Sequence, residues 1–178
     1  MVLIAGADEA GRGCVIGPLV LCIAYCKKED EQKLKKMGAK DSKELSPSRR
    51  EELKPMIEKI CKFSLISITA RELNELMNTY SLNEIEAMKI GEALTSLEKD
   101  KISAIYVDSP DTVKERFTKR ITKYYKGSAK IVSDHKADAK YPIVSAASIL
   151  AKTARDSAIE SIKKELNYDF NSGYTSDP

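Results

Sequence analysis

Short apolar runs separated by turn residues make up the first part of the chain. Residues 2–7 form one run, and residues 18–25 form a second across a glycine-rich turn. A continuous apolar run of this length, bounded by turn signals, is typical of a buried strand. The pattern therefore predicts two neighbouring strands, followed by a third over residues 63–69.

Helical patterns alternate with further strands in the rest of the chain. Ser46-Pro47 supplies an N-cap and a first-turn proline for one helix, which Pro55 should kink or restart. Ser81 and Glu84 form a capping box ahead of a long amphipathic helix. The other expected elements are helices at 30–38, around Val113 to Ile121 and at Ser145 to Leu166, and strands at 104–107 and 129–132. This order predicts an α/β fold, with a mixed β-sheet flanked by helices.

The composition agrees with one globular domain. The chain has 178 residues, of which 42% are hydrophobic and 32% are charged. No internal repeat, low-complexity stretch or linker divides it, so residues 1–178 are expected to form a single domain. No apolar run approaches the ~20 residues of a membrane-spanning helix, and no signal peptide is recognisable. We therefore expect a cytoplasmic protein with no membrane partner.

Cysteine, histidine and charge narrow the possible chemistry. The four cysteines show no CxxC pair and His135 is the only histidine, so a structural zinc site lacks ligands and reduced thiols are expected. The net charge of +3 does not by itself indicate a polyanionic partner. Basic runs such as Lys43 to Arg50 and Lys114 to Lys126 would suit phosphate chemistry around an acidic centre. Each run alone is more typical of a solvated helix face.

Acidic residues follow several of the predicted strands. Asp8 and Asp108 close the apolar runs IAGAD and AIYVD, and Asp138 follows the next strand. The carboxyl ends of strands in an α/β sheet are the usual place for a ligand. Carboxylates gathered there repel one another unless cations neutralise them, and Mg²⁺ prefers such oxygen ligands. Any one acid could instead be a helix cap or turn residue, which is the interpretation preferred for Asp111 and Asp134.

Other motifs exclude several classes of enzyme. The segment from Gly11 to Gly17 nearly matches a dinucleotide fingerprint, but its last glycine is one position late and a strand follows. The glycines would instead let backbone amides approach a sugar or phosphate, with Arg12 as a bidentate donor. Ser148 and Lys152 are too far apart for a Ser-x-x-Lys pair, and no GxSxG or Walker A sequence is present. These absences exclude covalent hydrolases and nucleotide triphosphatases. His135 is expected to be a structural loop residue.

Six segments, in order along the whole chain, closely resemble ribonuclease HII, particularly its archaeal members. They are Asp8-Glu-Ala-Gly-Arg-Gly13, Asp41-Ser-Lys-Glu-Leu45, Tyr106-Val-Asp-Ser109, His135-Lys-Ala-Asp138, Ser145-Ala-Ala-Ser-Ile-Leu-Ala-Lys152 and Ser172-Gly-Tyr174. The resemblance implies a ribonuclease H-like fold. It also implies an active site of Asp8, Glu9, Asp108 and Asp138 that holds Mg²⁺ or Mn²⁺, with two ions when substrate is bound.

The resemblance further implies the reaction and the substrate contacts. The expected enzyme is a metal-dependent endoribonuclease that hydrolyses the RNA strand of RNA–DNA hybrids and cuts at ribonucleotides embedded in duplex DNA. The products would carry a 3′-hydroxyl and a 5′-phosphate. Ribonucleotide recognition and phosphate binding are expected from Gly11, Arg12, Gly13, Ser42, Lys43, Lys136 and Tyr174.

The sequence departs from the family pattern at two points. Cys14 stands where many relatives have proline, and relatives usually continue beyond the Tyr174 segment, so we expect this chain to lack their C-terminal helical segment. Nothing in the sequence requires a partner subunit, so a monomer is expected.

Two alternatives to the endoribonuclease function stay open. One is a nucleic-acid-binding module that is inactive in this form, and the other is another ribonuclease H-like nuclease, such as a junction resolvase.

Overall fold

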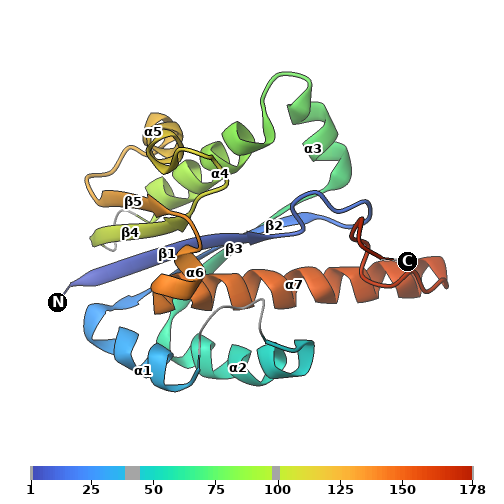
Figure 1. Ribbon diagram of the computed structural model, residues 1–178, viewed down its shortest axis with the longest axis horizontal. Helices are drawn as coiled ribbons and strands as arrows, with labels where there is room; N and C mark the ends of the chain where they lie inside the picture. The colour runs from blue at the N-terminus through green and yellow to red at the C-terminus, as the bar shows by residue number, and fades with distance from the viewer. Residues whose placement is uncertain (1, 39–44, 98–100, 178) are drawn as a thin grey trace.

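A five-stranded mixed sheet forms the centre of the molecule (Figure 1). The computed structural model describes residues 2–38, 45–97 and 101–177. The strands are β1 (Leu3–Ala10), β2 (Leu19–Lys27), β3 (Lys62–Ile68), β4 (Ile102–Asp108) and β5 (Lys130–Asp134), in the spatial order β3-β2-β1-β4-β5. The β1–β2 and β2–β3 pairs are antiparallel, whereas β1–β4 and β4–β5 are parallel. The predicted mixed sheet is confirmed.

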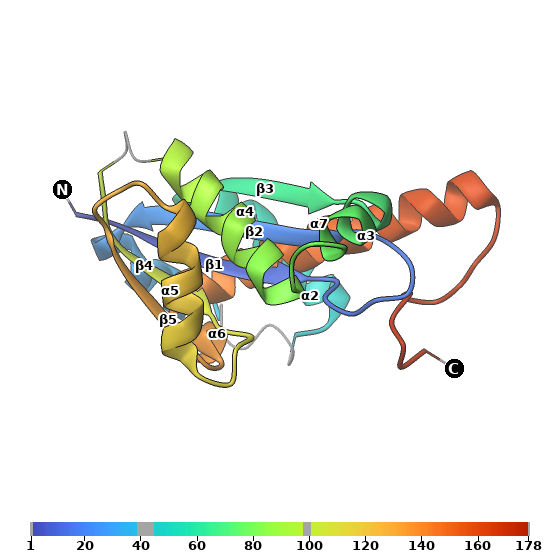
Figure 2. The ribbon, with the colours of Figure 1, turned by 90° about the horizontal axis from the view of Figure 1, so that it is seen from above.

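Helices cover both faces of this sheet (Figures 1 and 2). They are the short 3-10 helix η1 (Lys28–Asp30), α1 (Glu31–Lys36), α2 (Pro47–Ile60), α3 (Ala70–Met77), α4 (Leu82–Ser96), α5 (Lys114–Tyr124), α6 (Ala137–Lys140) and α7 (Pro142–Leu166). In Figure 1, α7, α1 and α2 lie below the sheet, and α4 and α5 lie above it. Within the described ranges, no helix combines the length and apolarity needed to cross a bilayer.

The two apolar faces of β2 explain why its sequence is apolar almost throughout. Val20, Cys22 and Ala24 pack in the cluster between the sheet and α7, whereas Leu21 and Ile23 pack in the cluster between the sheet and helices α4 and α5. Successive side chains of a strand point to opposite faces, so a strand covered on both sides needs apolar residues at every position. The four cysteines are free thiols, as the sequence predicts.

Helix α7 lies unusually close to β1. A Cβ atom added at Gly6 would stand 2.5 Å from the backbone carbonyl carbon and oxygen of Ile143. Ala146, Ala147 and Ala151 are fully buried on the same helix. Small residues permit this approach, and the contact fixes the position of β1 relative to α7.

Of the two effects predicted for Pro55, a kink or a restart of the helix, the restart does not occur. Helix α2 continues through Pro55 to Ile60, and its N-cap is Ser46, whose hydroxyl accepts a hydrogen bond from the Arg49 amide. Leu53 and Ile57 are fully buried on either side of the proline. Their burial supports the helix where the proline removes a backbone hydrogen bond.

Other elements differ from the sequence prediction at their ends. Helix α7 begins at Pro142 rather than Ser145, because a proline suits the first position of a helix. Helices α3 and α6 are not among the predicted elements. Helix α3 has a visible signal, since the Thr69 side chain caps it by accepting a hydrogen bond from the Glu72 amide.

Candidate active site

Two of the predicted acids, Asp8 and Asp108, lie one position beyond the last parallel pair of β1 and β4. The last pair in that register is Ala7 with Val107, so Asp8 and Asp108 come next on the two neighbouring strands. The expectation that β1 ends before Asp8 needs correction. The strand continues to Ala10, because its antiparallel pairing with β2 extends further than its pairing with β4.

Burial and mutual repulsion raise the pKa values of the two acids on β1. Asp8 is 5% exposed. Burial, and then the charges of Glu9 and Asp108, raise its pKa well above the usual range, although a hydrogen bond with Ser148 acts in the opposite direction. Burial, followed by the charges of Glu86 and Asp108, raises the pKa of Glu9 to about 8. The site therefore concentrates more negative charge than its protein surroundings offset.

The fourth predicted acid, Asp138, is held close to Asp108 through the backbone of α6. The Ala137 amide donates a 2.7 Å hydrogen bond to Asp108 Oδ1. Asp138 is the next residue, is only 3% exposed, and accepts a hydrogen bond from the Ala139 amide at 3.0 Å. The left-handed conformation of Lys136, with φ of 53°, starts the short helix that brings Asp138 to this position.

A cavity of about 240 Å³ brings most of the predicted site together. Its lining residues are Asp8, Glu9, Ala10, Gly11, Arg12, Asp108, Lys152 and Tyr174. Lys152 ends one of the six family-like segments, and the sequence alone gives no role for it. Ser148 and Lys152 are separated by one helical turn, which places both on the face of α7 toward the acids.

The remaining predicted substrate-binding residues occupy different positions. The Gly11 amide donates a 3.1 Å hydrogen bond to the Tyr174 hydroxyl, which joins the glycine loop to the C-terminal segment. Gly13 is exposed with φ of +70°, and Lys136 is exposed beside α6. Ser42 and Lys43 lie outside the described residues.

The Arg12 side chain binds α4. Its Nε donates a 2.9 Å hydrogen bond to Glu86 Oε1, and its Nη2 donates to Asn83. The sequence predicts this guanidinium to be a bidentate donor for a sugar or phosphate of the substrate, but two of its nitrogens already have protein partners. Glu86 is 1% exposed, and burial raises its pKa to about 7 despite the nearby Arg12 charge. In the sequence, the position of Glu86 next to the apolar residue Ile85 is the available indication that Glu86 is buried.

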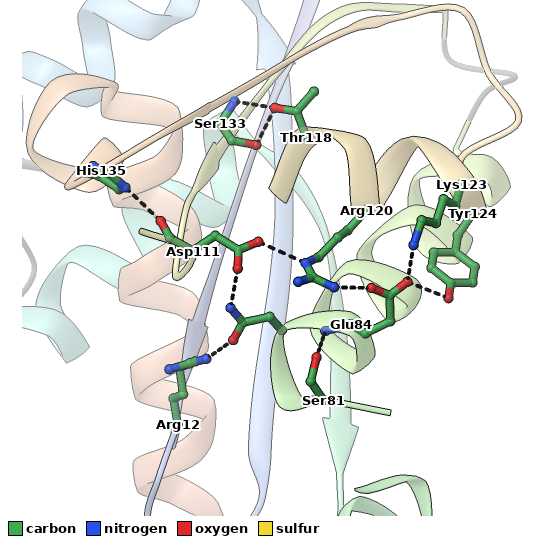
Figure 3. A network of polar contacts seen from close by, with 11 residues as sticks. Arg12, Ser81, Glu84, Asp111, Thr118, Arg120, Lys123, Tyr124, Ser133 and His135 are labelled. Carbon is green, nitrogen blue, oxygen red and sulfur yellow. Dashed lines mark hydrogen bonds and ion pairs between the residues drawn. The ribbon is translucent and has the colours of Figure 1, made fainter. Parts of the chain in front are cut away.

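A polar network extends from Arg12 across the loops beside the acids (Figure 3). Asn83 donates to Asp111 Oδ1 at 2.7 Å, and Arg120 Nε donates to Asp111 Oδ2 at 3.0 Å. Arg120 also pairs with Glu84 on α4. The network links the loops after β1 and β4 to helices α4 and α5, so it stabilises the positions of the loops around the cavity.

Asp134 and His135, at the end of β5, have structural partners. Hydrogen bonds from Lys140 and Lys114 lower the pKa of Asp134 to about 2. A ring nitrogen of His135, Nε2, lies 2.8 Å from the Asp111 carbonyl oxygen, which connects the loops after β4 and β5. These partners agree with the predicted structural roles of Asp134 and His135.

The chemistry of the acids fits a hard divalent cation. Carboxylate oxygens are the ligands that Mg²⁺ and Mn²⁺ prefer, and a cation would offset the burial and the repulsion that raise the pKa values of Asp8 and Glu9. Across the ranges 2–38, 45–97 and 101–177, no three acidic, histidine or cysteine side chains already stand in a metal-binding arrangement. Cation binding would therefore require side-chain rearrangement among these acids.

The stability of the metal-free protein should fall as pH rises from about 5 to about 8. The folded-state pKa values of Glu9 and Glu86, about 8 and about 7, exceed the usual value of 4.5. The folded protein therefore binds more protons than the unfolded chain in this interval, and folding loses stability as these protons leave. Thermal denaturation at several pH values measures the effect. Glu86→Gln should reduce the slope, and a flat or rising profile in the parent protein would contradict this explanation.

Comparison with solved structures defines the class of protein. The structure matches the Archaeoglobus fulgidus ribonuclease HII of a PCNA complex, with a TM-score of 0.90 and 45% identity, covering 99% of this chain and 84% of that chain. It also matches Bst-RNase HIII in complex with Mn²⁺, with a TM-score of 0.81 and 21% identity, covering 94% of this chain and 56% of that one. The fold is ribonuclease H-like.

Sequence comparison identifies the family within this class. The ribonuclease HII family model matches residues 5–178. Ribonuclease HII from Archaeoglobus fulgidus is 45% identical over 174 residues, covering 98% of this chain and 81% of the relative. Ribonuclease HII from Pyrococcus abyssi is 48% identical over 176 residues, covering 98% and 77%, respectively. The chain belongs to the ribonuclease HII family, whose enzymes cleave the RNA of RNA–DNA hybrids.

Proposed function

We propose that this chain is a divalent-metal-dependent endoribonuclease acting on RNA–DNA hybrids and on ribonucleotides embedded in duplex DNA. Its products would carry a 3′-hydroxyl and a 5′-phosphate. The observation that carries the proposal is the convergence of Asp8, Glu9 and Asp108 on one cavity, with raised pKa values for the first two. Membership of the ribonuclease HII family supports the substrate class.

The proposed metal ligands are Asp8, Glu9, Asp108 and Asp138, with Mg²⁺ or Mn²⁺ as the ion and two ions in the substrate complex. When bound, such ions stabilise the charge that develops on a phosphodiester during hydrolysis. The burial of Asp8 and Asp138 supports their assignment, because buried carboxylates need a compensating charge. The Mn²⁺ complex of Bst-RNase HIII supports the choice of metal class.

Substrate recognition is assigned to the side of the cavity formed by the glycine loop and the C-terminal segment. Gly11, Gly13 and Tyr174 would read the ribonucleotide, since an aromatic ring and backbone groups can distinguish ribose from deoxyribose. Arg12 would hold the loop through its contacts with α4. A separate set of residues, Ser42, Lys43 and Lys136, would bind backbone phosphates.

The other assignments concern the protein as a whole. Residues 1–178 would act as one catalytic domain. We assign the protein to the cytoplasm and expect it to act as a monomer. Sedimentation with and without a hybrid duplex would determine its oligomeric state.

Cleavage of a DNA duplex containing one ribonucleotide tests the proposed function. The expected result is a cut beside the ribonucleotide in Mg²⁺ or Mn²⁺, with no cut after chelation of the metal. An otherwise identical all-DNA duplex should remain intact, because it lacks the 2′-hydroxyl. End-labelled products, treated with a phosphatase or a ligase, would establish the chemistry of the two ends.

Two other outcomes would favour different functions. Cleavage of the all-DNA duplex would indicate another ribonuclease H-like nuclease and would contradict the proposed ribose requirement. Tight binding without cleavage, unchanged in Asp138→Asn, would indicate a nucleic-acid-binding module. A filter-binding measurement made on the same duplexes separates this second outcome from simple loss of affinity.

A further inference from the structure

A fully buried arginine lies beneath the residues assigned to ribonucleotide recognition. Arg155 is on α7 and is 1% exposed. Its guanidinium carbon is 4.1 Å from the centroid of the Tyr174 ring. Its Nη2 donates a 3.2 Å hydrogen bond to the backbone carbonyl of Ile16. One side chain therefore contacts both the loop after β1 and the C-terminal segment.

The hydrogen bonding of Arg155 is incomplete for a buried charge. Its Nε and Nη1 have no hydrogen-bond partner among the described residues, and Asp156 Oδ1 is 4.0 Å from Nη1. Leaving buried donors without acceptors is unfavourable for folding. The face of the Tyr174 ring offers a cation–π contact that offsets part of this cost. The arginine and the tyrosine ring therefore depend on each other.

The backbone around Arg155 brings the two recognition segments together. The amides of Val15 and Ile16 both donate to the Gly173 carbonyl, at 2.8 and 3.2 Å. A Cβ added at Gly173, where φ is +76°, would lie 2.8 Å from the Ile16 carbonyl oxygen and 3.3 Å from Arg155 Nη2. Only a glycine leaves room for this approach, so the position of Tyr174 follows from the packing around Arg155.

We propose that Arg155 is a positioning residue for ribonucleotide recognition. Its guanidinium packs against the Tyr174 ring and donates a hydrogen bond to the Ile16 carbonyl. These two contacts together determine where the Tyr174 ring and hydroxyl lie at the cavity. The Gly11 amide, which donates to that hydroxyl, is held by the same assembly. This inference rests on the proposed function, in which Tyr174 contacts the ribonucleotide.

A double-mutant cycle on Arg155 and Tyr174 tests the proposal. The variants are Arg155→Met, Tyr174→Ala and their combination, assayed for kcat/KM on DNA containing one ribonucleotide. Arg155→Met should lower kcat/KM on the order of 10²-fold, because misplacing a substrate contact by about 1 Å has that effect. In the Tyr174→Ala background, Arg155→Met should cause little additional loss, because the contact that it positions is already absent.

A role in stability alone predicts a different result. In that case Arg155→Met would lower kcat/KM by the same factor in both backgrounds, and additive effects would overturn the proposal. The matched control is Lys163→Met, on the same helix as Arg155. It removes a cation that lies 6.0 Å from the centroid of the Phe170 ring and should leave kcat/KM unchanged. Melting curves ensure that every variant is folded at the assay temperature.

A second variant covers the case in which Arg155→Met does not fold. Arg155→Lys keeps a cation but loses the planar guanidinium, so it should also lower kcat/KM and show the same dependence on Tyr174. Normal activity of Arg155→Lys would overturn the proposal. If Tyr174→Ala itself retains normal kcat/KM, the recognition role of Tyr174 is wrong. If Tyr174→Ala is slow and Arg155→Lys is normal, only the positioning role of Arg155 is wrong.

Discussion

Replacing Asp8 with asparagine should slow cleavage by about 10³-fold while leaving the metal-free protein at least as stable. Asp8 is 5% exposed, and its pKa is raised by burial and by the charges of Glu9 and Asp108. The amide would remove a proposed metal ligand and relieve this repulsion. Single-turnover cleavage at saturating Mn²⁺ measures the rate, and thermal denaturation without metal measures the stability.

The matched control is an acid of the opposite electrostatic character. Asp134 lies at the end of β5, and ion pairs with Lys140 and Lys114 keep its pKa low. Asp134→Asn should therefore lower stability and leave the cleavage rate near that of the parent. A near-normal rate for Asp8→Asn would remove Asp8 from the proposed ligand set. A slow Asp134→Asn, with parent-like stability, would place Asp134 in the active site instead.

Replacing Gly6 with alanine should destabilise the protein by about 3 kcal/mol, or roughly 10 °C in Tm. The added Cβ would be 2.5 Å from the backbone carbonyl atoms of Ile143 and 2.6 Å from the amide nitrogen of Val144. Backbone atoms in the first turn of α7 cannot move aside as a flexible side chain can. The helix would have to move away from β1, and the proposed metal ligand Asp8 would lose its alignment with Ser148.

Gly38→Ala separates this clash from the general cost of replacing a glycine. Gly38 has φ of +84°, and an added Cβ would meet no atom of the described residues within 4 Å. Its replacement should cost only about 1–2 kcal/mol, the usual strain of a left-handed residue. Equilibrium unfolding in denaturant compares the two variants. Equal losses of stability would show that close packing of α7 on β1 is not the cause of the Gly6 effect.

Much of the fold could be predicted because the local signals agreed with the packing. The apolar runs of β1 and β2 and the Ser81 cap of α4 all appear where the sequence places them. Glu84 shows the limit of such signals. Its amide binds the Ser81 hydroxyl, but its carboxylate pairs with Arg120 on α5 instead of completing the capping box. The tertiary contact with Arg120 therefore determines the position of the Glu84 side chain.

The proposed site was only partly predictable for the same reason. Asp8 and Asp108 could be placed together because both close apolar runs, and the two runs form neighbouring parallel strands whose corresponding positions lie side by side. Glu86 and Arg155 could not be placed. Glu86 contacts a residue 74 positions away, and Arg155 contacts one 139 positions away. A helical pattern shows that such residues share a face with apolar neighbours, but it does not identify a distant partner.

Anomalous diffraction from crystals soaked in Mn²⁺ is the most direct test of the proposed active site. The expected result is an Mn²⁺ peak within coordination distance of carboxylate oxygens from Asp8 and Asp108, with Glu9 or Asp138 completing the ligand set. Asp8→Asn crystals soaked in the same way should show a weaker peak. An Mn²⁺ peak bound elsewhere, with these acids left without metal at a saturating concentration, would contradict the proposed active site.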